Sequence, residues 1–307
     1  MTDAAIETVD LAKRYGQITA LVGLSMRVER GSIFGFLGPN GAGKTTAVKL
    51  LLGLAHPTAG RASILGAELG DGPAHRAARR RVGYLPELFR YAGWLTAREV
   101  LATHCALALM DRMSWPAAIA EALATVGLAE RADTRVDTFS KGMQQRLGLG
   151  VSLLGDPDLV VLDEPTSALD PVGRHDVREI VRSLRARGTT VFLNSHLLTE
   201  VEQVCDRVAV VDRGRVIATG PLSELLRGDA VHVRATGLAA DARAALAREG
   251  FDLDGDGERF VARDVGPERV PLLVEALVRA GARVYAIEPQ HESLEERFLS
   301  LVGDERS

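Results

Sequence analysis

The sequence predicts an α/β fold built on a mostly parallel sheet, followed by a smaller α+β unit. An apolar strand over 32–37 runs into a glycine-rich loop and then a helix over 44–54. Two further runs, 159–162 and 190–193, are short and wholly apolar, as strands buried in parallel sheets are. A helix over 173–187 separates those two runs, which is the spacing of a β-α-β unit.

The length and composition are those of a globular chain larger than one ordinary domain. It has 307 residues, of which 46% are hydrophobic and 25% charged, so we expect it to fold throughout. The net charge of -4 gives no overall basic field, so no nucleic-acid partner is expected. Cys105 and Cys205 form no ligand spacing and are expected to be buried free thiols in a reducing cytoplasm.

The sequence shows no feature that would place it in a membrane. Its acidic start, 1–10, lacks the basic and apolar parts of a secretory signal. No apolar run approaches the roughly 18 residues that suggest a membrane span. We therefore expect a cytoplasmic protein whose role at a membrane would require another polypeptide.

Two segments flank or interrupt the parallel core. Over 6–28 apolar and polar residues alternate loosely, with breaks at Tyr15-Gly16 and Val22-Gly23, which predicts short antiparallel strands. From about 88 to 155 apolar residues recur at helical spacing, beginning with a capping box formed by Thr96 and Glu99. This stretch is predicted to be a helical insertion.

The chain is predicted to form two domains, at 1–222 and 228–307. The second has candidate strands at 231–234, 259–262 and 284–287 and candidate helices at 239–248, 267–280 and 293–302. In the first, 76–81 holds four arginines, a run typical of a solvated helix face.

The glycine-rich segment fits the pattern G-x-x-x-x-G-K-[ST], whose backbone N–H groups curl around phosphates. Its lysine reaches the terminal phosphates, and the helix adds its positive dipole end at the same point. A ligand-free turn is the alternative, which the flanking strand and helix disfavour. The predicted nucleotide-binding residues here are Gly38, Pro39, Asn40, Gly41, Ala42, Gly43, Lys44, Thr45 and Thr46; Thr45 is also a predicted Mg²⁺ ligand and Lys44 a predicted catalytic residue.

Two carboxylates end the apolar run at 159–162, where open α/β sheets bind ligands. Asp163 suits water-mediated Mg²⁺ binding. Glu164 could polarise an attacking water if burial and phosphate charge hold it near its working pKa. By itself such a pair is as often a helix N-terminus, so the interpretation depends on the upstream phosphate loop.

Between these phosphate motifs, 139–146 (Phe-Ser-Lys-Gly-Met-Gln-Gln-Arg) resembles the signature of the ABC ATPases. It departs from the common LSGGQ form at three positions but keeps Ser140 and Gly142. Those two residues could touch a γ-phosphate at a helix start. The resemblance covers about 6–220 and implies an ABC-type P-loop NTPase core that binds ATP with Mg²⁺.

Three further positions resemble functional residues of the ABC ATPases and occur in the same order along the chain. Tyr15 resembles the aromatic that stacks on adenine, although an aromatic in a strand is commonly core. The segment 167–170 resembles the loop that crosses the dimer interface, and its Asp170 is predicted to contribute to the nucleotide site. His196 resembles the switch histidine that senses the γ-phosphate, the alternative being a structural strand-end histidine.

Residues 84–87 resemble the loop that joins the core to the helical insertion, but end in Glu87 where most members have glutamine. A carboxylate can still bind Mg²⁺ or water, so Glu87 is predicted to contact the nucleotide and the metal. Whether Glu87 also takes part in catalysis is left open. By the same resemblance, the next residues receive a helix of the membrane subunit. Phe89, Tyr91 and Trp94 suit such an interface and suit the core of the helical insertion equally well.

The resemblance implies an ATP-hydrolysing subunit that works as a head-to-tail ATP-sandwich dimer. Its partner would be a separate membrane-spanning permease, at the cytoplasmic face of the cell membrane. The tail at 293–299 is similar to exporter ATPases of the daunorubicin-resistance type, which favours export. One alternative is a soluble ABC ATPase that acts on ribosomes, DNA or iron–sulfur assembly; the single ATPase unit disfavours most such versions. The other alternative is a module that binds ATP without turnover, and Glu164 argues against it. The cargo, whether drug, lipid or polysaccharide, is left open.

Overall fold

The computed structural model describes residues 4–298, apart from Asp71, Ala168, Asp256, Asp264 and Glu292. This part of the chain divides into two compact units, the first ending at Leu222 and the second beginning at Ser223. Nowhere in the described ranges is a helix both long and apolar enough to cross a membrane.

A six-stranded sheet forms the centre of the first unit, and it confirms the predicted α/β class. The strands lie in the order β10 (Arg215–Pro221), β9 (Arg207–Asp212), β3 (Ile33–Leu37), β8 (Thr190–Ser195), β7 (Leu159–Asp163) and β6 (Val82–Leu85). All neighbours are parallel except β10, which runs antiparallel to β9. Parallel order places the carboxyl ends of β3, β6, β7 and β8 at one edge, where the candidate site lies.

The central strands are buried on both faces, which is why they read as unbroken apolar runs. Every residue of β3, β7 and β8 is buried. Phe192 lies between Phe34 and Phe36, with ring centroids 6.0 and 5.3 Å away. The sheet is therefore a rigid platform for the loops that leave it.

A second, four-stranded sheet packs beside this core in the order β2 (Ile18–Glu29), β1 (Ala4–Tyr15), β4 (Ala59–Ile64) and β5 (Ala67–Glu68). The predicted turn at Tyr15-Gly16 is confirmed. The predicted break at Val22-Gly23 is wrong, because β2 continues through both residues. Gly23 instead has φ +93 and faces an irregular stretch of β1 in which Asp10 has φ +49. The glycine therefore serves a strand irregularity rather than a turn.

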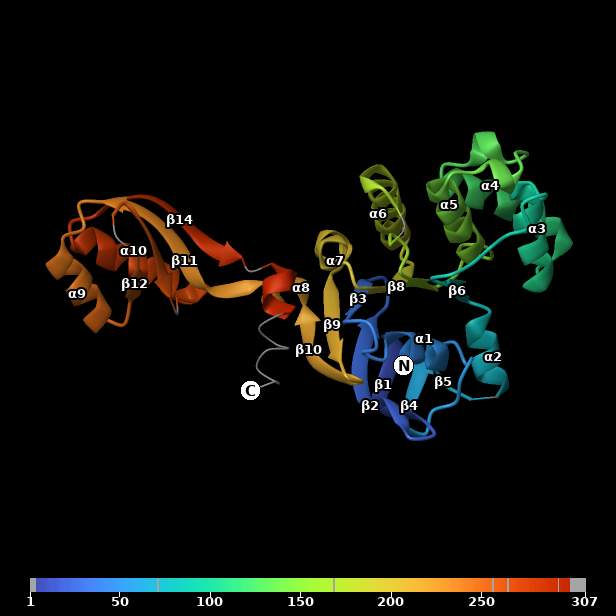
Figure 1. Ribbon diagram of the computed structural model, residues 1–307, viewed down its shortest axis with the longest axis horizontal. Helices are drawn as coiled ribbons and strands as arrows, with labels where there is room; N and C mark the ends of the chain where they lie inside the picture. Colours follow the sequence, from blue (N-terminus) through green and yellow to red (C-terminus); the bar gives the residue numbers. More distant parts are fainter. Residues whose placement is uncertain are drawn as a thin grey trace. The chain divides into compact units, whose positions relative to one another are not determined.

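Helices surround the sheet. They are α1 (Lys44–Leu51), α2 (Pro73–Arg79), α3 (Ala97–Leu107), α4 (Trp115–Thr125), α5 (Lys141–Ser152), α6 (Pro171–Ala186) and α7 (Leu198–Val204), with 3₁₀ turns at Arg112–Ser114, Ala129–Arg131 and Val136–Thr138. A short helix, α8 (Leu222–Leu225), spans the boundary between the two units in the chain. Helices α3, α4 and α5, which follow β6 and precede β7 in the chain, pack on one another as one group (Figure 1). The predicted capping box opens α3, since the Thr96 hydroxyl accepts from the Glu99 N–H and the Glu99 carboxylate accepts from the Thr96 N–H. Both cysteines are buried and free.

The second unit combines an antiparallel sheet with helices. Its strands run in the order β12 (Asp252–Asp254), β13 (Arg259–Arg263), β11 (Arg227–Thr236) and β14 (Arg283–His291), and its helices are α9 (Ala240–Arg248) and α10 (Val270–Arg279), the latter after a 3₁₀ turn at Pro267–Arg269. It has its own apolar core, which includes Val233, Phe260 and Leu273. Of the helix expected over 293–302, residues 294–298 are helical, Ser293 precedes the helix, and 299–302 lie outside the described residues.

Candidate nucleotide site

The phosphate-loop candidate lies between the end of β3 and the start of α1. Gly41 and Gly43 have φ +85 and +101, which glycine adopts freely. A Cβ at Gly38 would lie 2.2 Å from the Val211 carbonyl oxygen, and one at Gly43 would lie 2.4 Å from the Ala20 carbonyl oxygen. Side chains are thus excluded by backbone on one side, while nothing lies within 4 Å of a Cβ at Gly41. The loop is packed beneath and open where a ligand would approach.

Lys44 is folded back over this loop. Its ammonium donates to the carbonyl oxygens of Gly38 at 2.6 Å and Pro39 at 3.3 Å. Burial lowers the pKa of Lys44, and the nearby Glu164 and Asp163 carboxylates oppose that shift. The first turn of α1 holds no acidic residue, so its N-terminal N–H groups keep their attraction for an anion.

The two carboxylates that follow β7 are both buried, with Asp163 2% and Glu164 7% exposed. Glu164 has φ +51, a left-handed conformation that is unusual for a residue with a side chain. Its N–H donates to the Asn194 carbonyl oxygen at 2.9 Å, which fixes this conformation at the end of the neighbouring strand. The sharp turn places consecutive carboxylates at the same end of the sheet.

Asn194 is a site residue that sequence reasoning missed. Its Nδ2 donates to Asp163 Oδ1 at 2.5 Å. Burial raises the pKa of Asp163, and this hydrogen bond acts in the opposite direction. Asn194 Oδ1 is buried and has no hydrogen-bond partner among the residues that the structure describes. The only available signal was its position at the carboxyl end of an apolar strand, two residues before His196 in the chain.

Burial also raises the pKa of Tyr84 to about 12, with Asp163 and Glu87 adding to the effect. The Tyr84 hydroxyl therefore stays protonated at neutral pH.

His196 meets Glu164 directly. Its Nδ1 lies 2.7 Å from Glu164 Oε2, and the imidazole is 44% exposed while the carboxylate is 7% exposed. One side of the ring is thus held and the other faces the open part of the site. The position expected for a switch histidine is occupied by a ring that can contact a ligand.

These elements surround one cavity of about 330 Å³. Its lining includes most of the predicted nucleotide-site residues, namely Pro39, Asn40, Gly41, Gly43, Lys44, Thr45, Thr46, Glu87, Asp163, Glu164 and His196. It also includes four residues that were not predicted: Ile18, Thr19, Ala20 and Asn194. Segments far apart in sequence thus meet at the carboxyl ends of β3, β6, β7 and β8.

Gly38 and Ala42 lie in the same loop without lining that cavity. The Gly38 carbonyl accepts from Lys44, and the Ala42 carbonyl accepts from the Gly214 N–H. Tyr15 also lies outside the lining; it pairs across the hairpin with Ile18, which does line the cavity. Its ring is 46% exposed, and the Lys13 ammonium lies 4.8 Å from the ring centroid. The ring is therefore available beside the cavity.

The signature residues and the interface aspartate also lie outside the cavity. Ser140 is the N-cap of α5 and accepts from the Met143 N–H at 3.2 Å, with Gly142 in the first turn of that helix. Asp170 is the N-cap of α6 and accepts from the Gly173 N–H at 2.8 Å. Ala168, in the same predicted loop, is outside the described residues. One copy of the chain therefore does not bring the phosphate loop and the signature to one site.

The aromatic segment after Glu87 divides between the two expected roles. Phe89 and Tyr91 are half-buried with ring centroids 5.3 Å apart, and a Cβ at Gly148 of α5 would lie 2.7 Å from Phe89. They belong to the core of the helical insertion. Leu88 and Trp94 are 87% and 72% exposed and are available to a partner.

A larger cavity of about 800 Å³ lies in the second unit, lined by residues of β11, β13 and β14 such as His232, Arg234 and Arg259. None of the predicted site residues lines it. The smaller cavity is the candidate site because it gathers the phosphate loop and the carboxylates.

Comparison with known proteins agrees with this geometry. The chain matches the ABC transporter family over residues 8–167. It is 39% identical to the daunorubicin resistance ATP-binding protein DrrA3 of Streptomyces coeruleorubidus, covering 100% of this chain and 98% of that protein. It is also 39% identical to the Nod factor export ATP-binding protein I of Burkholderia orbicola, covering 99% of each.

Among solved structures, an ATP-binding subunit of an ABC transporter superposes with a TM-score of 0.64 at 32% identity, covering 72% of this chain and 91% of that one. The ABC ATPase fold and the predicted ATPase activity are thus confirmed. The chain belongs to the ABC transporter family and is an ATP-binding subunit that hydrolyses ATP to power transport.

Proposed function

We propose that this chain powers an exporter, as one of two identical ATPase subunits beneath a separate membrane-spanning permease at the cytoplasmic face of the membrane. The proteins it resembles over nearly their full length include one named for Nod factor export, one for daunorubicin resistance and one for bacitracin transport. Two of these names refer directly to export or transport of a compound, which supports a transport role for this chain. The permease would make the contacts to the cargo and would therefore determine which class of compound is exported.

The main observation behind this proposal is that residues of the phosphate loop line one cavity together with Glu164 and His196, whereas Ser140 lies outside that cavity. In this proposal Lys44 and the N–H groups at the start of α1 bind the β- and γ-phosphates. Glu164 accepts the proton of the attacking water, and His196 orients Glu164 and contacts the γ-phosphate. Tyr15, beside Ile18, stacks on the adenine.

Mg²⁺ fits the same cavity. Among the described residues, no group of three or more histidine, cysteine or acidic side chains could hold a metal by itself. Mg²⁺ usually takes one or two carboxylates and completes its shell with phosphate oxygens and water. Thr45, Asp163 and Glu87 line the cavity and would hold it, and the unpartnered Asn194 Oδ1 adds a further oxygen at this edge. The ion would neutralise phosphate charge.

The dimer follows from what the single chain lacks. Ser140 and Gly142 stand at the N-terminus of α5, whose first turn has no acidic residue. Such a terminus favours an anion. In a head-to-tail dimer, the signature of one copy would contact the nucleotide held by the phosphate loop of the other.

The test mixes two damaged proteins. Lys44→Ala damages the phosphate loop, and Ser140→Arg places a bulky side chain where phosphate must approach. Each mutant alone should be nearly inactive, because every site in its homodimer has one damaged half. In the mixed dimer one site combines both intact halves, so ATP occlusion or phosphate release should return. Confirmed heterodimers that neither occlude nor hydrolyse ATP would contradict the shared-site arrangement.

A module that binds ATP without turnover is the competing function. The 2.7 Å contact between His196 and Glu164 beside the phosphate loop disfavours it, because binding alone requires no oriented base. Steady-state phosphate release by the purified wild-type protein separates the two.

A further inference from the structure

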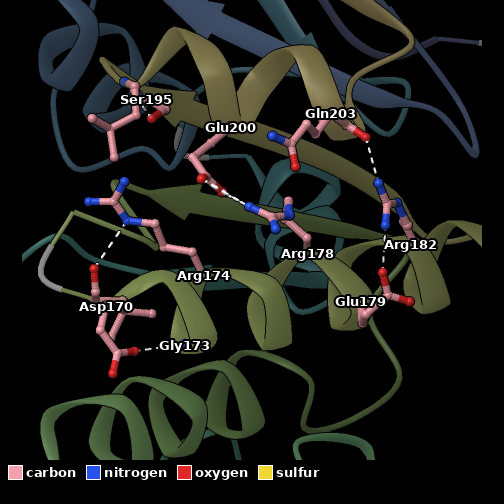
Figure 2. A network of polar contacts seen from close by, with 11 residues as sticks. Asp170, Gly173, Arg174, Arg178, Glu179, Arg182, Ser195, Glu200 and Gln203 are labelled. Carbon is pink, nitrogen blue, oxygen red and sulfur yellow. Dashed lines mark hydrogen bonds and ion pairs between the residues drawn. The ribbon is translucent and has the colours of Figure 1, made fainter.

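Three arginines line one side of α6 at intervals of four residues. Arg174, Arg178 and Arg182 therefore lie above one another on the face of the helix that looks toward α7 (Figure 2). Arg174 donates to the Leu169 carbonyl oxygen at 3.1 Å, and Arg182 donates to the Gln203 carbonyl oxygen at 2.8 Å. The row thus reaches from the loop before α6 to the last turn of α7.

The middle arginine forms a more buried ion pair than Arg182, which pairs with Glu179 on the exposed surface. Arg178 Nη1 donates to both carboxylate oxygens of Glu200, at 3.0 and 2.9 Å. The two side chains are only 16% and 8% exposed. A charge-assisted contact away from solvent holds its two groups in a defined geometry, and removal of one partner leaves the other charge buried and unpaired.

This pair lies directly behind the catalytic candidates. Arg178 and Glu200 line one small cavity together with Pro165, which follows Glu164 in the chain, and Ser195, which precedes His196. Ser195 Oγ accepts from the Leu197 N–H at 3.0 Å and so ties the turn that carries His196 to the start of α7. The ion pair therefore links α6 to the helix that continues from His196.

We propose that Arg178 and Glu200 are positioning residues of the ATPase reaction. Their ion pair holds α7 against α6, and α7 in turn holds the His196 ring at the Glu164 carboxylate. This inference rests on the proposed roles of Glu164 and His196. Neither residue of the pair lines the nucleotide cavity, so the pair acts on orientation and not on ATP affinity.

The main variant is Arg178→Met, which keeps the length of the side chain and removes its charge. Small misplacement of a reacting group lowers rates by up to about 10²-fold. We expect kcat to fall by about 10- to 100-fold, while the KM for ATP and the affinity for a fluorescent ATP analogue change less than about threefold. Glu200→Gln keeps the shape and one acceptor for Arg178, and it should lower kcat by a smaller factor.

The matched control is Arg187→Met. Arg187 is the C-cap of α6, at the end of the helix opposite Asp170, and pairs with the exposed Glu121 of α4 at 3.3 Å. Its loss should leave kcat within about twofold of wild type. A fall equal to that of Arg178→Met would overturn the proposal, because any lost arginine pair on this helix would then suffice.

A double-mutant cycle separates positioning from general support of the fold. If the pair acts through His196, Arg178→Met should lower kcat little further in a His196→Ala background. Multiplicative losses would overturn the proposal, as would a single variant that loses nucleotide binding along with kcat. Should Arg178→Met fail to fold, Glu200→Gln carries the same cycle. Failure of the underlying function is distinguishable, because His196→Ala alone would then leave turnover unchanged.

Discussion

His196 Nδ1 and Glu164 Oε2 lie 2.7 Å apart, at the carboxyl ends of the adjacent parallel strands β8 and β7. The carboxylate is buried and its backbone holds a left-handed conformation, while the ring is partly open. A buried base oriented by a histidine that faces the ligand is an arrangement for activating a nucleophile.

Glu164→Gln should keep ATP binding and slow hydrolysis by about 10²–10⁴-fold, the usual contribution of a positioned general base. The amide cannot accept the proton of water but keeps the size of the carboxylate. Phosphate release and ATP retention on the same preparation check both parts. Turnover within a few-fold of wild type would remove Glu164 from the base role.

Lys44→Ala should weaken nucleotide binding itself by about 10- to 100-fold, because a charge-assisted hydrogen bond contributes about 1.5–3 kcal/mol. Titration with a fluorescent ATP analogue measures the change. Lys49→Ala is the matched control, since Lys49 is exposed on the same helix. Unchanged affinity in Lys44→Ala would mean that the glycine-rich loop does not bind phosphate.

Asp163→Asn should raise the Tm of the nucleotide-free protein at pH 7 while abolishing Mg²⁺-dependent hydrolysis. Because the pKa of Asp163 is raised by burial, the folded state binds a proton more readily than the unfolded state. The Asp163 side chain therefore contributes most to the stability of the folded state below its ordinary pKa of 3.8. That contribution is lost as the pH rises through the raised pKa of the folded state. The gain from Asn should shrink as pH falls toward 3.8.

The control for that prediction is Asp133, whose pKa is shifted in the opposite direction. Hydrogen bonds from Arg98 lower the pKa of the exposed Asp133, so Asp133→Asn should not raise the Tm at pH 7. Heat unfolding of both variants and of wild type over one pH series provides the comparison. A lower Tm in Asp163→Asn than in Asp133→Asn at pH 7 would contradict the buried-charge argument.

Trp94→Ala combined with Leu88→Ala should leave the ATPase activity of the isolated protein within about twofold and weaken its attachment to the membrane subunit. Both side chains are largely exposed, so their truncation should change the stability of the fold little. Co-purification from membranes measures attachment. Met113→Ala, at a side chain 85% exposed outside this segment, is the control and should attach as wild type does.

Residues 1–222 alone should fold and bind nucleotide, because each unit has its own apolar core. A chain ending at Asp206 should not fold, since it lacks β9 and β10 of the central sheet. Heat unfolding and binding of an ATP analogue compare the two. An insoluble 1–222 chain would show that the second unit is required for folding of the first.

The sequence by itself determined the α/β class and indicated the glycine-rich loop, the carboxylate pair and His196 as one candidate site, because each depends on local chemistry. A buried parallel strand must be apolar along its length, and a backbone that curls around phosphate must have glycines, so β3, β7 and the loop from Gly38 could be read directly. The capping box of Thr96 and Glu99 was equally readable, because its contacts span one helical turn.

Tertiary structure decided what depends on strand order and on packing across the chain. Strand β2 continues through Gly23 because its partner β1 accommodates an irregular register, and that partnership leaves no local mark on a glycine. Asn194 reaches Asp163 only because β8 lies beside β7. The packing of Phe89 likewise depends on α5, whose Gly148 leaves room for that ring. The pairing of Arg178 with Glu200 required two helices to meet, and side-chain contacts between distant segments follow from the completed fold.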